Sequence, residues 1–275
     1  MKDIVVLFLI YTDKHLNDGM SEINKILGRM FGSFNANYVI IDNANSIEEN
    51  SNNNQHFIHG DNSCFDFSGW DKGYSFAKEQ GLIKSDSIIL FANDTFFQRN
   101  YADGENFLDV FDSNIIQGKD LDESAIGYLD DFPKMVTLDG IEYDSWIRSN
   151  IFFIPQKVMK KLGTMVFDFP KTRIFSDDIK KFWSDDPLIS DNWKAYISSW
   201  LFGVEDEQFP EYKLNWLKSR PLDESNWLFF QSKAMTILSE HYLTARLFDM
   251  KVPIIDTNVF PKDDLRHIKD YYKAQ

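Results

Sequence analysis

The stretch Ser87-Ile-Ile-Leu-Phe-Ala-Asn-Asp-Thr95 decides the fold of this chain. The segment from 87 to 92 is too apolar to have a face in water, which is typical of a strand covered on both sides in a parallel sheet. The run then stops on Asn93 and Asp94. Ligands of α/β sheets collect at the carboxyl ends of strands, and carboxylates there hold metal-bound phosphates. The stretch therefore predicts a buried strand with a ligand site at its end.

The residues before this strand predict further β and α elements in alternation. Apolar runs predict strands, and apolar residues at helical spacing predict helices. The expected strands cover residues 4–10, 38–41 and 56–58, and the expected helices cover residues 18–31 and 70–80. This order favours an α/β fold with a mostly parallel central sheet, right-handed crossovers and flanking helices.

Three polar segments follow three of the expected strands. They are Tyr11-Thr12-Asp13, Asp42-Asn43 and Asn93-Asp94. Because the carboxyl ends of parallel strands meet at one edge of a sheet, we expect all three segments on the same rim.

The second half of the chain predicts a less regular arrangement. We expect short β segments at 125–129 and 135–138, a strand at 146–154, a helix at 156–162, a helix at 225–250 and a last strand at 252–255. Five of the seven tryptophans lie between 171 and 227 among helical fragments, and core packing accounts for most of them. The organisation we predict is an α/β core in residues 1–170, a helical accessory region in 171–235, and a helix and strand returning to the core in 236–275.

Composition limits the classes of partner. The formal net charge of −14 argues against a nucleic acid, because binding its phosphates requires clusters of Lys and Arg. The single cysteine, Cys64, excludes an internal disulfide framework and suits a reducing compartment. No apolar run reaches the roughly 20 residues that span a bilayer. We therefore expect a cytoplasmic protein, with peripheral association at the inner face of the membrane left open.

The motifs around the decisive strand resemble a known family. Gly73, Ser75 and Gly81, followed by the apolar strand and Asn93-Asp94-Thr95, resemble a stretch of family 2 inverting glycosyltransferases, especially the rhamnosyltransferase-like and rhamnan synthesis protein F groups. The resemblance covers the first hundred residues well and 236–255 loosely. It implies the GT-A fold, a nucleotide-diphospho-sugar donor, a carbohydrate or lipid-linked acceptor, and a role in bacterial surface polysaccharide synthesis.

The resemblance also implies a metal site. In this family the D-x-D carboxylates coordinate Mg²⁺ or Mn²⁺ on the donor diphosphate. Asp94 corresponds to the last Asp of that motif, with Asn93 before it, and Ala92 stands where the first carboxylate would be. Cation binding is therefore expected to be weak or dispensable, or shared with a helix N-terminus, Arg99 or Arg148.

Other donor contacts follow from the same resemblance. Thr12, Asp13 and Asp42 correspond to segments that contact the nucleoside, although ordinary turns explain these residues too. Gly73, Tyr74 and Ser75 would line the donor pocket, with the glycine allowing close backbone approach.

Glu240 is the candidate catalytic base. An inverting transfer needs a carboxylate that takes the proton of the acceptor hydroxyl. The segment from Ser239 to Val252 resembles the E-D-x-D-x-x-x-R motif in outline, with Glu240 at the position of the catalytic Asp and Arg246 six residues later. The alternative is a solvated glutamate on an amphipathic helix.

Three other functions can be compared with this one. The main one is a non-catalytic module that binds nucleotide-sugars or carbohydrates through a degraded GT-A site. A serine hydrolase would need a strand directly before Gly73-Tyr-Ser-Phe-Ala77, and residues 67–72 do not resemble one. A nucleotidyltransferase would need a glycine-rich, lysine-containing loop after the first strand, which residues 11–19 do not supply.

Overall fold

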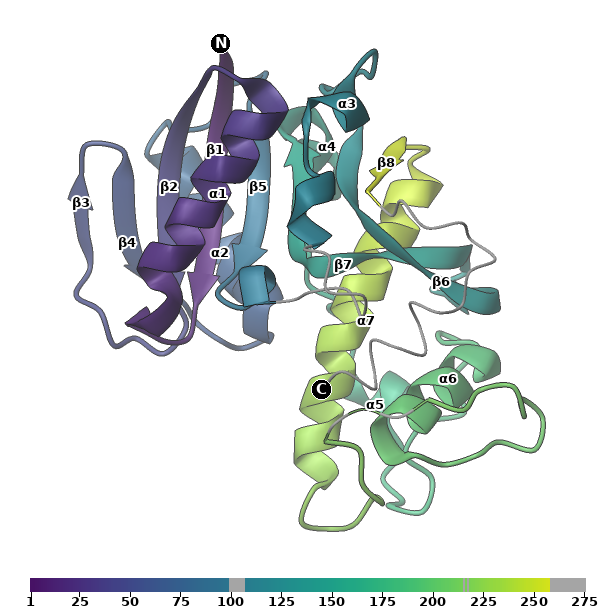
Figure 1. The fold of residues 1–275 in the computed structure, drawn as a ribbon. Helices are drawn as coiled ribbons and strands as arrows, with labels where there is room; N and C mark the ends of the chain where they lie inside the picture. The colour runs from purple at the N-terminus through teal and green to yellow at the C-terminus, as the bar shows by residue number, and fades with distance from the viewer. Residues whose placement is uncertain (99–106, 215, 217, 258–275) are drawn as a thin grey trace.

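The described residues form one mixed sheet of eight strands with helices on both faces (Figure 1). The computed structural model describes residues 1–98, 107–214, 216 and 218–257. The strands are β1 (Lys2–Ile10), β2 (Phe34–Asp42), β3 (Asn50–Asn52), β4 (Gln55–His59), β5 (Ile88–Asn93), β6 (Ala125–Leu138), β7 (Ile141–Pro155) and β8 (Ile254–Asp256). The helices are α1 (Leu16–Phe31), α2 (Phe65–Glu79), α3 (Ser113–Ile116), α4 (Gln156–Leu162), α5 (Lys171–Ile174), α6 (Asp191–Phe202) and α7 (Trp227–Asp249).

The order of the strands is β3-β4-β2-β1-β5-β7-β6-β8. The pairs β2–β4, β2–β1, β1–β5 and β6–β8 are parallel, whereas β3–β4, β5–β7 and β6–β7 are antiparallel. The predicted α/β class and mostly parallel sheet are confirmed, and each expected element of the first hundred residues forms within a few residues of its predicted bounds.

The two faces of the parallel half are covered by different helices. Figure 1 shows α1 in front of β1 and β2 and α2 behind them. Alternate residues of the strands point to opposite faces. Phe8 and Ile40 pack with α1, whereas Leu9 and Ile41 pack with α2. The segments 4–10, 38–41 and 88–92 of these strands are therefore buried on both faces, as the sequence indicates.

The chain reverses direction across the sheet at β1. From β1 it proceeds outward through β2 to β4, and it then returns to form β5 on the other side of β1. Such a reversal, a topological switch point, separates the connections that follow two neighbouring parallel strands and leaves room for a ligand at their carboxyl ends. Here these ends are the residues after Ile10 and Asn93.

A long antiparallel hairpin replaces the short β segments expected after residue 125. Asp139 and Gly140 join β6 to β7, with φ values of 51° and 76°. Two successive residues with positive φ match the twist of a tight hairpin, and a glycine at the second position accepts this conformation without strain. Because the ladder partners of β6 lie in β7, local sequence patterns predicted pieces of the hairpin but not its length.

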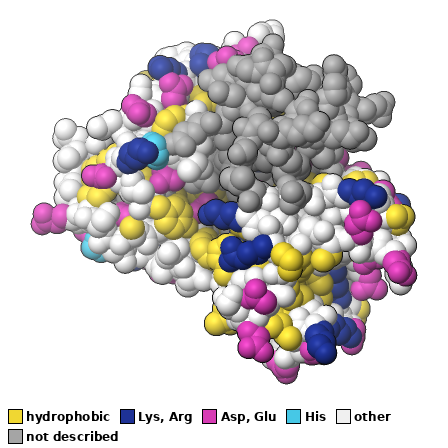
Figure 2. Space-filling model, turned by 60° about the horizontal axis from the view of Figure 1, so that its bottom comes forward, with side chains coloured by type: hydrophobic (Ala, Val, Ile, Leu, Met, Phe, Trp, Pro, Cys, Tyr) yellow, Lys and Arg dark blue, Asp and Glu magenta, His cyan; other side chains and the backbone are white. Residues whose placement is uncertain are grey.

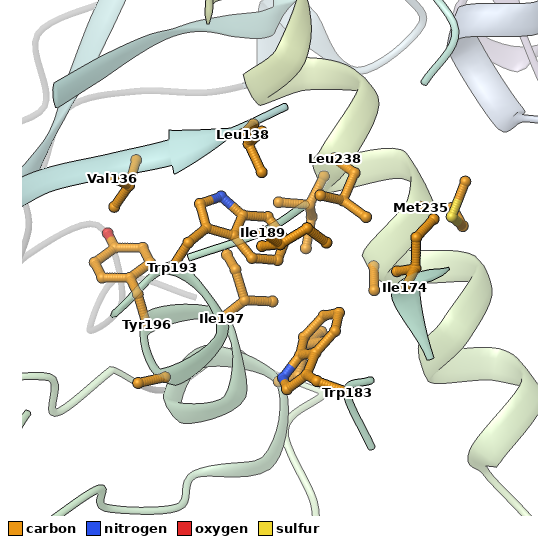
Figure 3. Close-up of a cluster of buried hydrophobic side chains, with 14 of the residues drawn as sticks. Val136, Leu138, Ile174, Trp183, Ile189, Trp193, Tyr196, Ile197, Met235 and Leu238 are labelled. Atoms are coloured by element: carbon orange, nitrogen blue, oxygen red, sulfur yellow. The ribbon is translucent and has the colours of Figure 1, made fainter. Parts of the chain in front are cut away.

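A separate hydrophobic core lies where the hairpin meets α5, α6 and the first half of α7 (Figure 3). Trp193 is completely buried there, and Trp183 contacts it with ring centroids 5.5 Å apart. The expected helix at 225–250 forms as α7, which continues through residue 236 without a break. The helix thus ties the segment 171–235 to the sheet.

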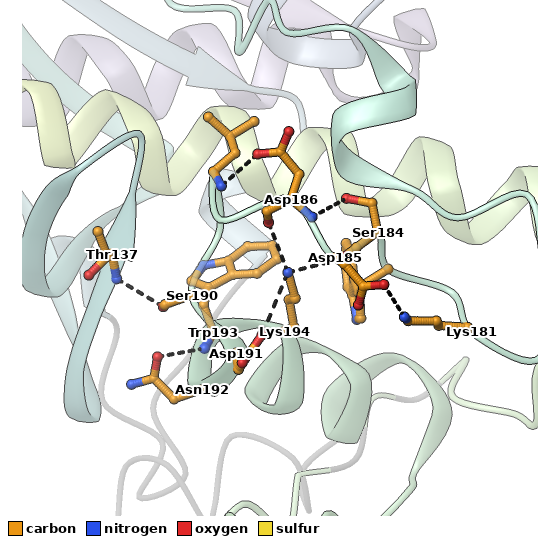
Figure 4. A network of polar contacts seen from close by, with 12 residues as sticks. Thr137, Lys181, Ser184, Asp185, Asp186, Ser190, Asp191, Asn192, Trp193 and Lys194 are labelled. Atoms are coloured by element: carbon orange, nitrogen blue, oxygen red, sulfur yellow. Dashed lines mark hydrogen bonds and ion pairs between the residues drawn. The ribbon is translucent and has the colours of Figure 1, made fainter.

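Lys194 fixes the loop before α6 (Figure 4). Its Nζ donates to the carbonyl oxygens of Ser184 at 3.0 Å and Asp186 at 3.2 Å, and it lies 3.6 Å from a carboxylate oxygen of Asp191. A buried ammonium group is costly unless it is paired. These contacts satisfy Lys194 and give it a structural role.

Among the helices that the structure describes, none combines the length and the apolar composition needed to cross a bilayer.

Candidate functional site

Polar side chains meet at the carboxyl ends of β2, β1 and β5, on the face covered by α2. Asn43 Nδ2 donates to the Tyr11 hydroxyl at 3.3 Å. That hydroxyl donates to Asp66 Oδ1 at 3.0 Å, and Asn93 Nδ2 donates to Asp66 Oδ2 at 3.2 Å. The predicted rim is therefore confirmed, and a carboxylate from α2 lies at its centre.

Asp66 reaches the rim from the first turn of α2. Glycines let this helix approach the strands closely: a Cβ on Gly69 would lie 2.5 Å from Leu9 Cδ1 and 2.8 Å from Asn43 Oδ1. Burial raises the pKa of Asp66, and the negative charge of Asp94 adds to the rise. The site therefore holds a carboxyl group whose ionised form a nearby positive charge would stabilise.

Asp94 lies on the other side of the β1 terminus. It is buried, and its Oδ2 accepts a hydrogen bond from the Tyr11 backbone N–H at 2.9 Å. Tyr11 thus contacts both acids, Asp94 through its backbone and Asp66 through its hydroxyl. We call Asp66 and Asp94 the acid pair.

Glu240 approaches from α7. Its Oε1 accepts a hydrogen bond from the Ser149 backbone N–H at 2.7 Å. Ser149 lies in a bulge of β7: between the pairs Gly127–Phe152 and Leu129–Ile147, β6 advances two residues and β7 advances five. A bulge takes backbone groups out of the ladder and is frequent beside active sites. The freed N–H holds the carboxylate of Glu240.

The bulge also places Glu240 near the end of β5. Pairing between β5 and β7 ends at Ala92 opposite Ile151. Asp94 lies two residues after the last pair and Ser149 lies two residues before it on the antiparallel partner. The acid pair and Glu240 therefore lie at the same edge of the sheet.

Lys233 interacts electrostatically with both Asp66 and Glu240. Burial raises the pKa of both Asp66 and Glu240, and the positive charge of Lys233 opposes the rise at each. One ammonium group is thus within electrostatic reach of both carboxyls. Lys233 precedes Glu240 by seven residues on α7, about two helical turns, so the two share a face of the helix.

Asn150 is a further polar residue in the bulge. It is buried, and within the described residues neither its Nδ2 nor its Oδ1 has a hydrogen-bond partner. A buried amide without partners is destabilising, and such groups in native proteins call for an explanation. Asn150 directly follows Ser149, whose backbone N–H binds Glu240, and its amide carries a donor and an acceptor.

Thr12 and Asp13 lie on the rim and are exposed. The Thr12 hydroxyl accepts a hydrogen bond from the Lys14 N–H at 3.0 Å and caps the short 3₁₀ turn Asp13–His15. This hydrogen bond uses one acceptor position of the Thr12 hydroxyl, and the side chains of Thr12 and Asp13 stay accessible to solvent.

Asp42 lies on the rim but is occupied by its own loop. Its carboxylate accepts hydrogen bonds from the backbone N–H groups of Ala44, Ser46 and Ile47 and from the Ser46 hydroxyl. Burial acts to raise the pKa of Asp42, but these bonds hold it below its ordinary value. The contacts support the turn interpretation of this residue over nucleoside binding.

Gly73, Tyr74 and Ser75 lie in the middle of α2, away from the rim. A Cβ on Gly73 would lie 2.4 Å from Ile41 Cδ1, so this glycine allows helix and strand to pack. The Tyr74 hydroxyl donates to Gln156 Oε1 at 3.0 Å, and Ser75 is exposed. Because Ser75 is inside a helix, the nucleophile-elbow geometry is absent from this segment.

The basic and histidine residues near Glu240 have structural partners. Arg246 donates to the carbonyl oxygens of Leu162 and Thr164. His241 is buried and accepts a hydrogen bond from Trp193 Nε1 at 2.9 Å, and burial lowers its pKa to about 3. Arg148 forms a two-pronged pair with Asp130. Arg99 lies outside the described residues.

Sequence reasoning missed Asp66, Lys233 and Asn150. The predicted helix began at Trp70, which left Asp66 in a loop without a role. Lys233 resembles any solvated helical lysine, and the β7 bulge that holds Asn150 depends on pairing with β6. A capping signal before Phe65 could have revealed Asp66, but Cys64 at that position makes no side-chain cap.

The donor set fits a cation only in part. In the described part of the chain, no group of three or more His, Cys, Asp or Glu side chains could hold a metal ion. Mg²⁺, however, is commonly held by one or two carboxylates together with substrate phosphates. The acid pair can supply such a partial site.

Comparison of the chain with protein-family models, with curated proteins and with solved structures found no match.

Proposed function

We propose that this chain is an inverting glycosyltransferase with a GT-A-type core, which moves a sugar from a nucleotide-diphospho-sugar to a carbohydrate or lipid-linked acceptor in bacterial surface polysaccharide synthesis. One observation carries the proposal: the acid pair and Glu240, from opposite halves of the chain, lie at the same edge of the sheet. That edge is the topological switch point, where α/β sheets bind ligands.

The acid pair would bind the donor diphosphate through Mg²⁺ or Mn²⁺. Asp94 would be the firm ligand, with Asp66 and the Asn93 amide beside it. When bound, the cation would neutralise the charge that develops on the departing diphosphate. The exposed Thr12 and Asp13 are available to the nucleoside. Gly73, Tyr74 and Ser75 have no part in the proposed site.

Glu240 would act as the general base. The acceptor hydroxyl oxygen attacks the anomeric carbon as the bond to the diphosphate breaks, and Glu240 takes the hydroxyl proton. Burial raises the pKa of Glu240, which makes its carboxylate a stronger base than a solvated one. The hydrogen bond from the Ser149 backbone N–H orients the carboxylate.

A non-catalytic binding module is the second candidate. The observation that favours it is Ala92, which is fully buried in the α1 face where a first metal-binding carboxylate would stand. A protein with this site could bind a nucleotide-sugar without transferring it.

Donor turnover separates the two candidates. We would titrate the chain with a panel of nucleotide-sugars, with and without Mn²⁺, and measure the nucleoside diphosphate released in the presence of saccharide and lipid-linked acceptors. The enzyme predicts acceptor-dependent release, whereas the module predicts binding alone. Asp94→Asn and Glu240→Gln should each lower release by about two orders of magnitude or more. Glu79→Gln, on the exposed end of α2, is the matched control. Full activity in Glu240→Gln would eliminate the proposed base.

A further inference from the structure

A cavity of about 520 Å³ lies between the second half of α2 and the edge of the sheet that β3 and β4 form. Figure 1 shows these two strands at the left edge of the sheet and α2 behind it. Sites for small molecules have volumes of roughly 300 to 1,000 Å³, so this volume suits a small ligand. We call this hollow the edge cavity.

The edge strand leaves one face of α2 uncovered. The strand β3 comprises only Asn50–Asn52, and all three residues are exposed. On α2, the exposed Lys72, Ser75 and Glu79 are spaced three and four residues apart, so they share the helix face that lines the cavity. Lys72 follows Asp66 by six residues, about 9 Å along the helix axis. A ligand in the edge cavity would therefore not occupy the candidate site.

The cavity has an apolar part with an aromatic ring. Phe57, Ile58 and Phe76 supply it. His56 contacts two residues of the wall: its ring centroid lies 5.7 Å from that of Phe76, and its Nδ1 lies 3.0 Å from Ser51 Oγ. Burial lowers the pKa of His56, so the ring is neutral at pH 7. The wall thus combines an aromatic surface with a serine hydroxyl held by a neutral imidazole.

Charges of both signs line the cavity. One lysine, Lys72, stands against two glutamates, Glu49 and Glu79. A hydrogen bond from the His59 N–H and the attraction of Lys72 hold the pKa of Glu49 below its ordinary value. Figure 2 shows acidic and basic side chains interspersed with hydrophobic ones over the parallel half of the sheet, at its left. A strongly charged ligand of either sign would meet a like charge here, so the lining favours a neutral ligand.

The lining is also unusually polar for a small-molecule site. Six of its nine residues are polar or charged, namely Glu49, Asn50, Ser51, Lys72, Ser75 and Glu79. Most ligand pockets are predominantly apolar with a few polar groups. Hydroxyl, amide, ammonium and carboxylate groups together offer both donors and acceptors. A planar heterocycle has two apolar faces and would leave many of these groups without partners. A pyranose matches them better, because hydroxyls surround the ring and C–H groups form one face.

We propose that the edge cavity binds a neutral saccharide. Phe76 would pack against the C–H face of the sugar ring, and Asn50, Ser51 and Ser75 would exchange hydrogen bonds with its hydroxyls. This site goes beyond the proposed function, because it is separate from the acid pair and Glu240. A non-catalytic module with the same cavity would bind the saccharide equally well.

Saturation-transfer NMR on the full chain tests the edge cavity. The probes are the methyl glycosides of glucose, galactose, mannose, N-acetylglucosamine and rhamnose, each titrated without a nucleotide. We expect at least one glycoside to bind. Ser75→Trp, which fills the cavity from an exposed position of α2, should abolish this binding. Lys72→Gln should raise the Kd about threefold to tenfold, because it removes a charge-assisted hydrogen bond. Lys78→Trp places the same ring at an exposed position of α2 outside the cavity lining and is the matched control.

Four outcomes would overturn the saccharide proposal. They are no binding of any glycoside, binding that Ser75→Trp leaves intact, an equal loss of binding in Lys78→Trp, and Ser75-dependent binding of adenosine or inorganic phosphate in place of the glycosides. Because the titration needs no donor, a chain that binds glycosides in the edge cavity but releases no nucleoside diphosphate contradicts only the proposed function. A chain with acceptor-dependent release whose glycoside binding is unchanged in Ser75→Trp contradicts only the edge cavity.

Discussion

Replacing Asn150 by leucine should stabilise the protein and weaken its ligand affinity. The two side chains have the same number of non-hydrogen atoms, and in the part of the chain that the structure describes neither amide atom of the buried Asn150 has a hydrogen-bond partner. A buried polar group without a partner costs about 1 to 3 kcal/mol. We expect the free energy of unfolding to rise by about 2 kcal/mol, which corresponds to about 4 to 8 °C in Tm for a chain of this size.

The same substitution removes a donor and an acceptor at the residue that follows Ser149, the partner of Glu240. If Asn150 is retained for ligand hydroxyls, losing one hydrogen bond should raise the Kd of the best-binding nucleotide-sugar or acceptor about threefold to tenfold. Urea unfolding and thermal melting measure the change in the free energy of unfolding, and calorimetric titration measures the change in Kd.

Asn93→Leu is the matched control for this experiment. The Asn93 amide makes hydrogen bonds through both of its polar atoms: Nδ2 donates to Asp66, and Oδ1 accepts from the Thr95 N–H. Removing the amide leaves these partners unsatisfied and should lower the stability of the protein. Opposite signs in the two variants support the argument. A loss of stability in Asn150→Leu comparable to that in Asn93→Leu would refute it, because the amide would then have a partner in the folded protein.

Four other substitutions test helix packing and the electrostatics of buried carboxyl groups. Gly73→Ala should lower the free energy of unfolding by about 1 to 3 kcal/mol, because its Cβ would overpack against Ile41. Gly28→Ala, on the open side of α1, should raise the free energy of unfolding by up to about 1 kcal/mol. Urea titration measures both changes, and an unchanged stability of Gly73→Ala would contradict the packing role of Gly73. Because burial raises the pKa of Glu240, transfer should fall as the pH drops through a midpoint above the pKa of free glutamate. The same pKa shift lowers the stability of the folded protein as the pH rises through that midpoint, so Glu240→Gln should be at least as stable as the parent at pH 7. A transfer profile that is flat from pH 4 to 8 would contradict the role of Glu240. The hydrogen bonds that hold the pKa of Asp42 low stabilise the fold above the ordinary pKa of an aspartate, and this stabilisation is lost in acid. Asp42→Ala should therefore speed hydrogen exchange in the loop after β2 at pH 7. Unchanged protection of that loop would exclude a stabilising role for Asp42.

The candidate site was predictable wherever one local pattern sufficed. The apolar run that ends at Asn93-Asp94 indicated a buried strand with polar residues at its carboxyl end, and Asp94 there accepts a hydrogen bond from Tyr11. The polar residues after the first two strands were correctly expected on the same rim, because parallel strands align their carboxyl ends. By contrast, the segment from Gly73 to Ser75 was predicted to contact the donor, whereas Gly73 packs against Ile41.

Sequence by itself determined the positions of the buried strands, the covering helices and the polar rim, because apolar periodicity is a local property that burial enforces. Only the tertiary structure decided that α2 carries Asp66 between Tyr11 and Asn93, and that the bulge in β7 offers the Ser149 N–H to Glu240. The physical reason is that these contacts join residues far apart in the chain. Their geometry depends on strand register and on helix approach, which no single segment encodes.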